Sequence, residues 1–279
     1  MPRRKSFKLK LRLTKKQKRR LATFLVLGLC VLGGFLLLKP HPQTVTPKGP
    51  PTHRRSSRPK IVFVIDDIGN HNRYNAQIKA LGRKVTYAIL PLLPYSRYYG
   101  DLSLTTGAEV ILHLPLDTVQ DKIPGRGLIV DTMSSSDILS MLAHDLDSVP
   151  NHVGVNNHMG SRGTASRQMM TIILKELKRR GLFFLDSYTT PESVVPSVGR
   201  AIGLPILARG IFLDNKDSKP AIHAQINQLR EVAREKGNAI AIGHYRANTL
   251  ELLAKEIPRL EHEGFEIITL KKMLKVQRD

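Results

Sequence analysis

The sequence predicts an α/β fold in which parallel strands alternate with helices, most simply a distorted (β/α) barrel of seven or eight units. Short β-branched or apolar runs recur through residues 60–279, as expected of parallel strands buried on both faces. Stretches with apolar residues at the helical period separate them. A doubly wound open sheet is the alternative. Either arrangement places chemistry at the carboxyl ends of the strands.

Eight segments have the composition of buried strands. In chain order they are Ile61–Ile65, Val85–Leu90, Glu109–Leu112, Val153–Asn156, Leu182–Leu185, Leu204–Leu207, Ala239–Ile242 and Phe265–Thr269. Four helical patterns lie between them, over residues 138–149, 169–177, 222–233 and 250–260. Gly181, Gly237 and Gly264 follow the last three patterns, at the position just after a helix where glycine is favoured.

The N-terminal segment differs in charge from the rest of the chain. Residues 1–59 hold 16 of the 44 Lys and Arg residues and none of the 23 Asp and Glu residues. Residues 60–279 therefore carry 28 basic and 23 acidic residues, a net charge of +5. Because this is an ordinary surface balance, the basic excess gives no reason to expect a nucleic-acid partner for the folded part.

Residues 21–38 predict a transmembrane anchor. This run of 18 residues has no charge and follows residues 1–20, which contain eleven Lys or Arg. As a helix it is roughly 27 Å long, close to the thickness of a bilayer core, and the basic flank is expected in the cytoplasm. A cleaved signal peptide is the competing interpretation, but no small-residue cleavage site follows the run. A basic nucleic-acid arm is disfavoured because the apolar run follows directly.

Residues 39–59 read as a disordered linker that leads to a single folded domain at residues 60–279. The linker contains six prolines and five basic residues, a composition that does not build a core. The only cysteine, Cys30, lies in the apolar run, which excludes a disulfide scaffold. With the anchor, this organisation predicts a single-pass protein of the bacterial inner membrane whose folded domain is periplasmic.

A pair of carboxylates ends the first predicted strand. Asp66 and Asp67 occur in I-V-F-V-I-D-D-I-G. One of them can bind a hard cation while its neighbour forms a hydrogen bond to a water molecule bound to that cation. The alternative is that the pair caps a helix starting near residues 70–72.

Three histidines stand at other strand exits. His113 begins H-L-P-L-D, with Asp117 four residues on, and the proline between them assigns both to an exit loop. His158 ends G-V-N-N-H, and His244 ends A-I-A-I-G-H. A single buried histidine is more often structural, but three beside an aspartate pair favour a site. One Asp and two neutral imidazoles leave an open position on Zn²⁺ or a similar cation, as hydrolysis requires.

Other strand exits carry Asp186, Arg209 and Asp214. The two acids can orient a histidine or contact a substrate, and Arg209 can keep a carboxylate charged; loop caps and a surface ion pair are the alternatives. Six tyrosines can line a sugar groove, of which Tyr245 is best placed: Tyr74, Tyr95, Tyr98, Tyr99, Tyr188 and Tyr245. The remaining histidines of the folded part are assigned to surface or helix positions: His71, His144, His152, His223 and His262.

Six motifs occur in a recognisable order from about residue 60 to the C-terminus. They are I-D-D-I-G, L-H-L-P-L-D, G-V-N-N-H-M-G-S, F-F-L-D-S, F-L-D-N and I-G-H-Y-R. Together they resemble the divergent polysaccharide deacetylase family, a remote relative of the NodB-homology carbohydrate esterases. The resemblance implies a distorted (β/α) barrel with one divalent metal ion, most simply Zn²⁺.

The resemblance also implies roles for individual residues. In the T-F-D-D-G motif of the esterases the first Asp is the general base and the second a metal ligand, which here are Asp66 and Asp67. The first histidine of their H-x-x-x-H motif matches His113, but Asp117 stands at the second place. His158 is therefore the candidate for the second imidazole ligand, and Asp117 is an additional ligand or a substrate contact.

The C-terminal end of the resemblance supplies the general acid. His244, in I-G-H, matches the histidine that plays this role in the esterases. Two departures accompany it. The R-x-P-Y motif has no clear counterpart, and Arg209-Gly210-Ile211 stands where R-D-V is expected, so that one acidic group is missing.

These features predict a metal-dependent hydrolase that removes N-acetyl groups from an envelope polysaccharide or peptidoglycan-type glycan. The expected partners are that glycan and the membrane. The alternative is a non-catalytic or weakly active membrane-tethered glycan-binding protein, supported by Asp117 and by the unmatched motifs. A third interpretation is a metal-dependent hydrolase that acts on another bond, such as a phosphoester.

Overall fold

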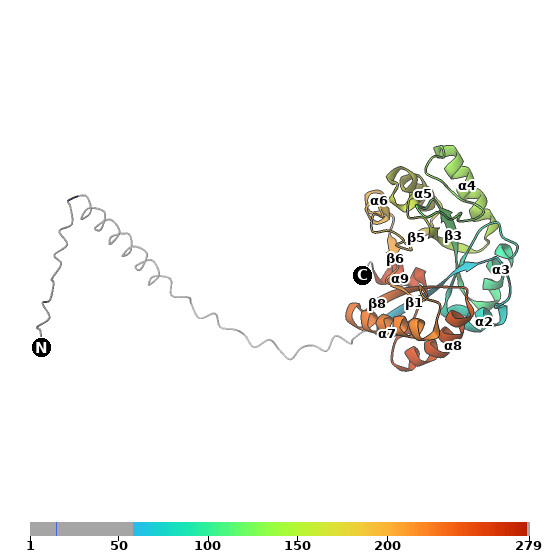
Figure 1. Ribbon diagram of the computed structural model, residues 1–279, viewed down its shortest axis with the longest axis vertical. Coiled ribbons are helices and arrows are strands. Elements are labelled where there is room, and N and C mark those ends of the chain that lie inside the picture. The colour runs from blue at the N-terminus through green and yellow to red at the C-terminus, as the bar shows by residue number, and fades with distance from the viewer. Residues whose placement is uncertain (1–14, 16–57, 278–279) are drawn as a thin grey trace, which may run out of the picture. The chain divides into compact units, whose positions relative to one another are not determined.

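A curled sheet of parallel strands with helices on its outer side makes up the folded part of the chain (Figure 1). The computed structural model describes Lys15 and residues 58–277. The strands are β1 (Lys60–Ile68), β2 (Thr86–Ile89), β3 (Glu109–Leu116), β4 (His152–Met159), β5 (Phe183–Asp186), β6 (Ile206–Ala208), β7 (Ile211–Phe212), β8 (Asn238–His244) and β9 (Glu266–Ile267). The helices are α2 (Asn75–Leu81), α3 (Ser96–Thr106), α4 (Ser135–Ser148), α5 (Arg167–Arg179), α6 (Val195–Ile202), α7 (Lys219–Lys236), α8 (Ala247–His262) and α9 (Leu270–Val276).

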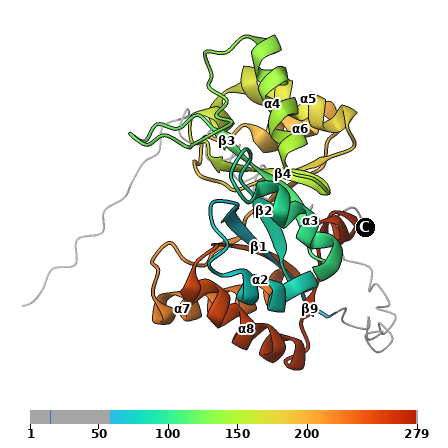
Figure 2. The ribbon, with the colours of Figure 1, turned by 90° about the vertical axis from the view of Figure 1, so that its right-hand side faces the viewer.

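The sheet follows the strand order β6-β5-β4-β3-β2-β1-β8-β7, and β9 pairs with the start of β1. Every pair is parallel, and a helix connects most consecutive strands. Figure 2 shows α4, α5 and α6 gathered at one end of the view and α2, α7 and α8 at the other. This curled half-barrel, in which parallel strands alternate with helices, resembles the predicted distorted (β/α) barrel.

The two edges of the curled sheet are consecutive in the chain. β6 pairs with β5, and β7 pairs with β8, but β6 and β7 are not paired with each other. Only Arg209 and Gly210 lie between them; the Arg209 amide donates to the carbonyl of Asp186 and the Gly210 amide to that of Ile240, both at 2.9 Å. In the described part of the chain, the structure is therefore a half-barrel bridged by two residues, and the closed ring of seven or eight paired strands is not formed.

Alternate side chains along the strands divide the core into two parts. On β1, Ile61, Phe63 and Ile65 face the helices, whereas Val62 and Val64 face the concave side. The concave cluster also contains Leu270 and Met273 of α9. Glu109, at the start of β3, accepts hydrogen bonds from the amides of Leu270 (2.7 Å) and Lys271 (3.1 Å). Helix α9 thus closes the end of the concave side at which the strands begin.

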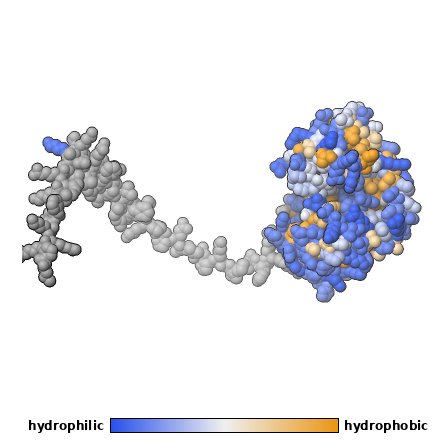
Figure 3. Space-filling view, viewed as in Figure 1, coloured by the Kyte–Doolittle hydropathy of each residue, from blue (hydrophilic) through white to orange (hydrophobic). Residues whose placement is uncertain are grey.

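The helices pack through apolar stripes of the expected period, as α5 illustrates. Its N-terminal cap is Ser166, whose hydroxyl accepts the Met169 amide. The side chains that it buries against the sheet are Met169, Met170, Ile173, Leu174 and Leu177. Each such burial stabilises the fold by about 1.5–3 kcal/mol. Gly181 follows the helix with φ of 71°, a left-handed conformation that glycine adopts without strain. The face in Figure 3 is mainly hydrophilic, consistent with these stripes pointing inward.

The structure extends several predicted strands and adds helices that the sequence analysis did not name. β1, β3 and β4 run three or more residues past their predicted ends, and helices α2, α3, α6 and α9 are additional. Among residues 58–277 no helix is both long and apolar enough to cross a membrane. The predicted cytoplasmic segment, anchor and linker at 1–20, 21–38 and 39–59 lie outside the described residues, apart from Lys15 and residues 58–59.

Candidate functional site

The site forms where the concave face of the sheet changes from apolar to polar. Side chains two residues apart on a strand point to the same face. The residue two places after an apolar residue of the concave face therefore also points to that face. Near the carboxyl ends of three strands, the residue two places on is polar: Asp66 follows Val64, His113 follows Ile111 and His244 follows Ile242. Asp66 is paired in register with His244 across β1 and β8. The predicted loop position of His113 is wrong, because β3 continues to Leu116.

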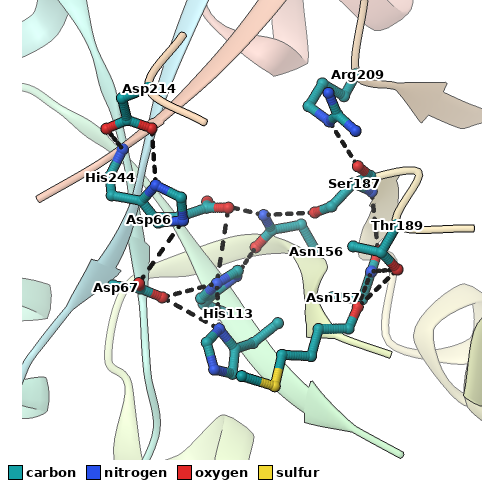
Figure 4. A network of polar contacts seen from close by, with 12 residues as sticks. Asp66, Asp67, His113, Asn156, Asn157, Ser187, Thr189, Arg209, Asp214 and His244 are labelled. Carbon is teal, nitrogen blue, oxygen red and sulfur yellow. Dashed lines mark hydrogen bonds and ion pairs between the residues drawn. The ribbon is translucent and has the colours of Figure 1, made fainter. Parts of the chain in front are cut away.

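A local break in β1 turns Asp67 towards the same side as Asp66. The pairing register between β1 and β2 shifts between Ile65 and Ile68, and Asp67 has φ of 63°, an uncommon value for a residue with a side chain. The Asp67 Oδ1 atom lies 3.3 Å from Nε2 of His113 (Figure 4). The same atom lies 3.1 Å from Nδ1 of His158. Those two imidazole nitrogens are 3.0 Å apart. Three donor atoms from three strands thus converge on one point.

These three donors fit a divalent metal ion. Atoms that bind one Zn²⁺ at its usual bond lengths are roughly 3 Å apart, as the three atoms here are. Oδ1 of Asp67 is buried and has no well-directed hydrogen-bond partner among the residues that the structure describes. A cation would supply that partner. Asp67, His113 and His158 form a cluster that can hold a metal ion.

Asn156 connects His113 to Asp66. Its amide oxygen lies 2.9 Å from Nδ1 of His113, and its amide nitrogen donates to Oδ1 of Asp66 at 3.0 Å and to the hydroxyl of Ser187 at 3.2 Å. With Nδ1–H of His113 donating to Asn156, Nε2 keeps its lone pair for a metal ion. The sequence pattern marks Asn156 only as a strand residue. Its position two residues before His158, on the same face of β4, was the signal for this role.

His244 is held by Asp214. Its Nδ1 lies 2.8 Å from Oδ1 of Asp214, and its amide donates to Oδ2 at 2.8 Å. The hydroxyl of Thr249 donates to the same Oδ2 at 2.6 Å. Nε2 of His244 is left facing the cluster, 3.8 Å from Oδ2 of Asp67. Asp214 therefore orients His244, one of the two roles the sequence offered for it.

The two adjacent aspartates have opposite pKa shifts. Burial raises the pKa of Asp66, although the nearby His113 and His244 act in the other direction. Burial acts on Asp67 as well, but the close approach of His113 and His158 outweighs it and holds the pKa of Asp67 well below its usual range. Asp67 is thus the anionic member of the pair, as a metal ligand must be, and Asp66 is the member more ready to accept a proton.

The pKa of His244 is raised. Burial acts to lower it, but the hydrogen bond to Asp214 and the charges of Asp67 and Asp214 outweigh burial. The pKa of Asp214 is lowered by the same contact, against the effect of its own burial. The pair therefore favours a protonated imidazole beside a charged carboxylate.

Two adjoining cavities form a cleft over the site. One has a volume of about 520 Å³ and includes Asp66 and His113 in its lining. The other has a volume of about 420 Å³ and includes His71 and Tyr245. Both are lined by Asp67, His158, His244 and Arg246. The metal cluster and His244 thus lie where the two halves of the cleft meet.

Arg209 and Tyr245 lie at the cleft, as the sequence suggested. Arg209 lines the larger cavity and donates to the carbonyl of Ser187 at 2.7 Å and to that of Tyr188 at 3.0 Å. Tyr245 is buried, and its hydroxyl oxygen lies 2.7 Å from that of Tyr99. Of the six tyrosines considered for a sugar groove, only Tyr188 and Tyr245 line these cavities.

Asp117 and Asp186 are not brought into the cleft. The carboxylate of Asp117 accepts the Asp131 amide at 3.4 Å and pairs with Arg162 at 3.9 Å. The carboxylate of Asp186 accepts the Tyr188 amide at 2.8 Å and the Ser193 hydroxyl at 2.7 Å. Both acids hold loops, which is the alternative that the sequence analysis had kept open for Asp186.

His71 was assigned to a surface or helix position and lies at the cleft instead. It lines the smaller cavity, and its ring centroid is 5.2 Å from that of Tyr245. No strand end or motif marked it, because it sits in the loop between β1 and α2.

The sequence model of the family described as divergent polysaccharide deacetylase matches residues 63–274, about three quarters of the chain. The chain belongs to this family. A Haemophilus influenzae protein described as uncharacterised is 35% identical over 205 residues, which are 73% of each chain. The predicted resemblance is thereby confirmed.

Solved structures agree with this divergent polysaccharide deacetylase fold. An uncharacterised protein from Agrobacterium tumefaciens superposes with a TM-score of 0.73 at 20% identity, covering 77% of this chain and 89% of that one. The catalytic domain of a peptidoglycan N-acetylglucosamine deacetylase from Eubacterium rectale gives a TM-score of 0.50 at 12% identity, covering 76% and 89%. At these identities the likeness concerns the fold alone.

Proposed function

We propose that this divergent polysaccharide deacetylase is a metal-dependent amide hydrolase that removes N-acetyl groups from an envelope polysaccharide or peptidoglycan-type glycan. The observation that carries the proposal is the convergence of Asp67, His113 and His158 on one point, with Asp66 and His244 beside it in the same cleft. A divalent ion held there, most simply Zn²⁺, would polarise the acetyl carbonyl and lower the pKa of a water molecule.

Asp66 is the general base in this proposal. It accepts the proton of the attacking water, and its raised pKa and burial suit that task. Asn156 occupies Oδ1, so Oδ2 faces the cleft, 3.6 Å from Nε2 of His113.

His244 is the general acid. Asp214 fixes Nδ1 and stabilises the imidazolium, which leaves Nε2–H to protonate the departing amine of the sugar. The products are acetate and a glycan with a free amino group. The acid and the base come from adjacent strands paired in register, so their separation is set by the sheet rather than by a loop.

Metal content and acetate release test the proposal together. Full-length protein, purified in detergent, is assayed by elemental analysis and with N-acetylated oligosaccharides. His113→Ala and His158→Ala should lose both the metal and turnover, whereas His144→Ala, an exposed histidine on α4, should keep both. A well-folded wild type that stays metal-free in excess cation and releases no acetate would favour the glycan-binding alternative.

We also propose, from residues 1–59 alone, that the protein is a single-pass protein of the bacterial inner membrane with its folded domain outside the cytoplasm. The basic segment and the uncharged run that follows it support this topology. Protease added to spheroplasts should digest the domain at residues 60–279 while sparing a cytoplasmic marker. Release of the protein from membranes by alkaline carbonate would contradict the anchor.

A further inference from the structure

The cleft is lined by an excess of cations. Across the two cavities, the lining acids are Asp66 and Asp67, both at the metal cluster. The lining Lys and Arg residues are Lys122, Arg126, Arg209 and Arg246. A divalent ion at the cluster would offset the two carboxylates, so that the four basic side chains give the cleft its charge.

Of these four cations, Arg209 has the acidic neighbours Asp66 and Asp186, but both lie beyond ion-pair distance from it. Among residues 58–277, none of the four cations forms an ion pair with a carboxylate. The arginines donate instead to backbone carbonyls, Arg126 to Leu92 at 3.3 Å and Arg246 to Asp214 at 3.1 Å. Carbonyl contacts orient a guanidinium but leave its charge for a ligand.

The cations lie on both sides of the metal cluster. Arg126 lines the smaller cavity, Lys122 and Arg209 line the larger one, and Arg246 lines both. Arg246 is also two residues from His244, where the two cavities meet. A ligand whose reacting group lies at the cluster would therefore meet positive charge in either direction along the cleft.

We propose that the cleft takes an anionic N-acetylated saccharide, in which sugars next to the one that is deacetylated carry carboxylates. The inference rests on the proposed function and adds the substrate's charge to it. Arginine is suited to this recognition because its planar donor fork matches a carboxylate. The exposed Lys122 and Arg126 should act mainly on association and make it salt-dependent.

Oligosaccharides that carry either a free carboxylate or its uncharged methyl ester test the inference. The probes are two N-acetylated tetrasaccharides, one with ring uronates and one with lactyl ethers, each as the free acid and as its methyl ester. Acetate release and calorimetric binding are measured with metal-loaded, full-length protein. The free acids should have a kcat/KM about 10–100-fold above the esters, mainly through KM, and the difference should shrink between about 50 and 500 mM salt. Comparison of the uronate probe with the lactyl probe shows which kind of carboxylate the cleft binds.

Substitution of the exposed Lys122 and Arg126 tests whether these side chains cause the preference for the free acid. Lys122→Gln and Arg126→Gln should each lower the preference in kcat/KM for the free acid over the ester about 3–10-fold. Lys79→Gln, an exposed lysine on α2 outside both cavities, is the matched control.

The outcomes separate the two proposals. Equal turnover and equal affinity for acid and ester would overturn the anionic specificity and leave the hydrolase intact. Tight, salt-sensitive binding of the acids without acetate release would overturn the hydrolase and leave the anionic specificity. Neither binding nor release of any probe would overturn both.

Discussion

The two ends of the concave face differ in polarity and in role: one is apolar and stabilises the fold, and the other is polar and carries the candidate site. At the end where the strands begin, the face is apolar and closed by α9, with side chains such as Ile111 and Leu270 fully buried. Two residues further along the same strands, it carries Asp66, His113 and His244, two of them buried. Buried ionisable groups cost stability unless they are paired. The apolar layer therefore has to stabilise the sheet that holds the polar layer in place.

The largest expected effect is on catalysis, at the polar end. Asp66→Asn should lower kcat by about 10²–10⁴, the usual contribution of a general base, because the amide cannot accept the proton. The ligand cluster of Asp67, His113 and His158 is untouched, so metal content should equal that of the wild type. Acetate release and elemental analysis on the same preparation measure both. Full activity in this variant would remove Asp66 from the mechanism.

The complementary substitution is at the apolar end. Ile111→Ala leaves a cavity beneath His113 and should lower the free energy of unfolding by about 2–5 kcal/mol. Below its unfolding temperature the variant should keep kcat within a few-fold of the wild type. Thermal unfolding and kinetics at 20 °C measure the two quantities, and Ile111→Val should cost only about 0.5–1.5 kcal/mol. A hundredfold loss of kcat with little loss of stability would mean that the two layers are not separable.

A smaller effect is expected at Asp214, which acts through His244. Asp214→Asn should lower kcat by about 10–100-fold. The pKa of His244 is raised by Asp214, and an acid must be protonated to act, so the alkaline limb of the pH–rate profile should move to lower pH. Thr249→Val, which removes one hydrogen bond to Asp214 but keeps its charge, is the control with a smaller shift. A profile unchanged in Asp214→Asn would rule out His244 as the titrating acid.

The position of most site residues could be predicted from the sequence because strands have a fixed period. Apolar runs that end in Asp66 and His244 place these side chains at the carboxyl edge of a parallel sheet, and the structure brings them together. Asp117 illustrates the limit. The resemblance makes Asp117, four residues after His113, an additional metal ligand or a substrate contact, but its carboxylate holds a loop instead. His158 reaches the cluster because His113 pairs with Asn156 across β3 and β4, two residues before His158. Strand register is a long-range property that local spacing does not contain.

The elements that the sequence analysis did not name are mostly short. Helices α2, α6 and α9 have seven or eight residues each, about two turns, which is too few for a helical period to stand out. The positive φ of Asp67 likewise has no local marker, since a glycine, the usual sign of such a conformation, is absent there. His71 was missed because only its loop conformation brings it to the cleft.

Asp145 of α4 is a buried acid that belongs to neither layer. It is fully buried, and neither carboxylate oxygen has a hydrogen-bond partner among the described residues. Gly127 packs against it so closely that a Cβ there would lie 2.2 Å from Oδ1. Burial raises its pKa from 3.8 to about 8. Asp214 is equally buried but has a lowered pKa, so the partners of a buried acid, rather than its depth, decide its charge.

This difference gives the smallest of the expected effects. Between pH 4 and 8 the unfolded chain has released the proton of residue 145 while the folded chain retains it, so the free energy of unfolding should fall as pH rises, by up to about 1.4 kcal/mol per pH unit. Asp145→Asn removes the share of that dependence that Asp145 contributes and should raise stability near pH 7.5 by about 1–3 kcal/mol. Asp147→Asn, an exposed acid on the same helix, should change neither quantity. Denaturant unfolding at several pH values measures the slope. A slope in Asp145→Asn that is unchanged from the wild type would mean that Asp145 is charged in the folded protein, and that the contrast with Asp214 does not hold.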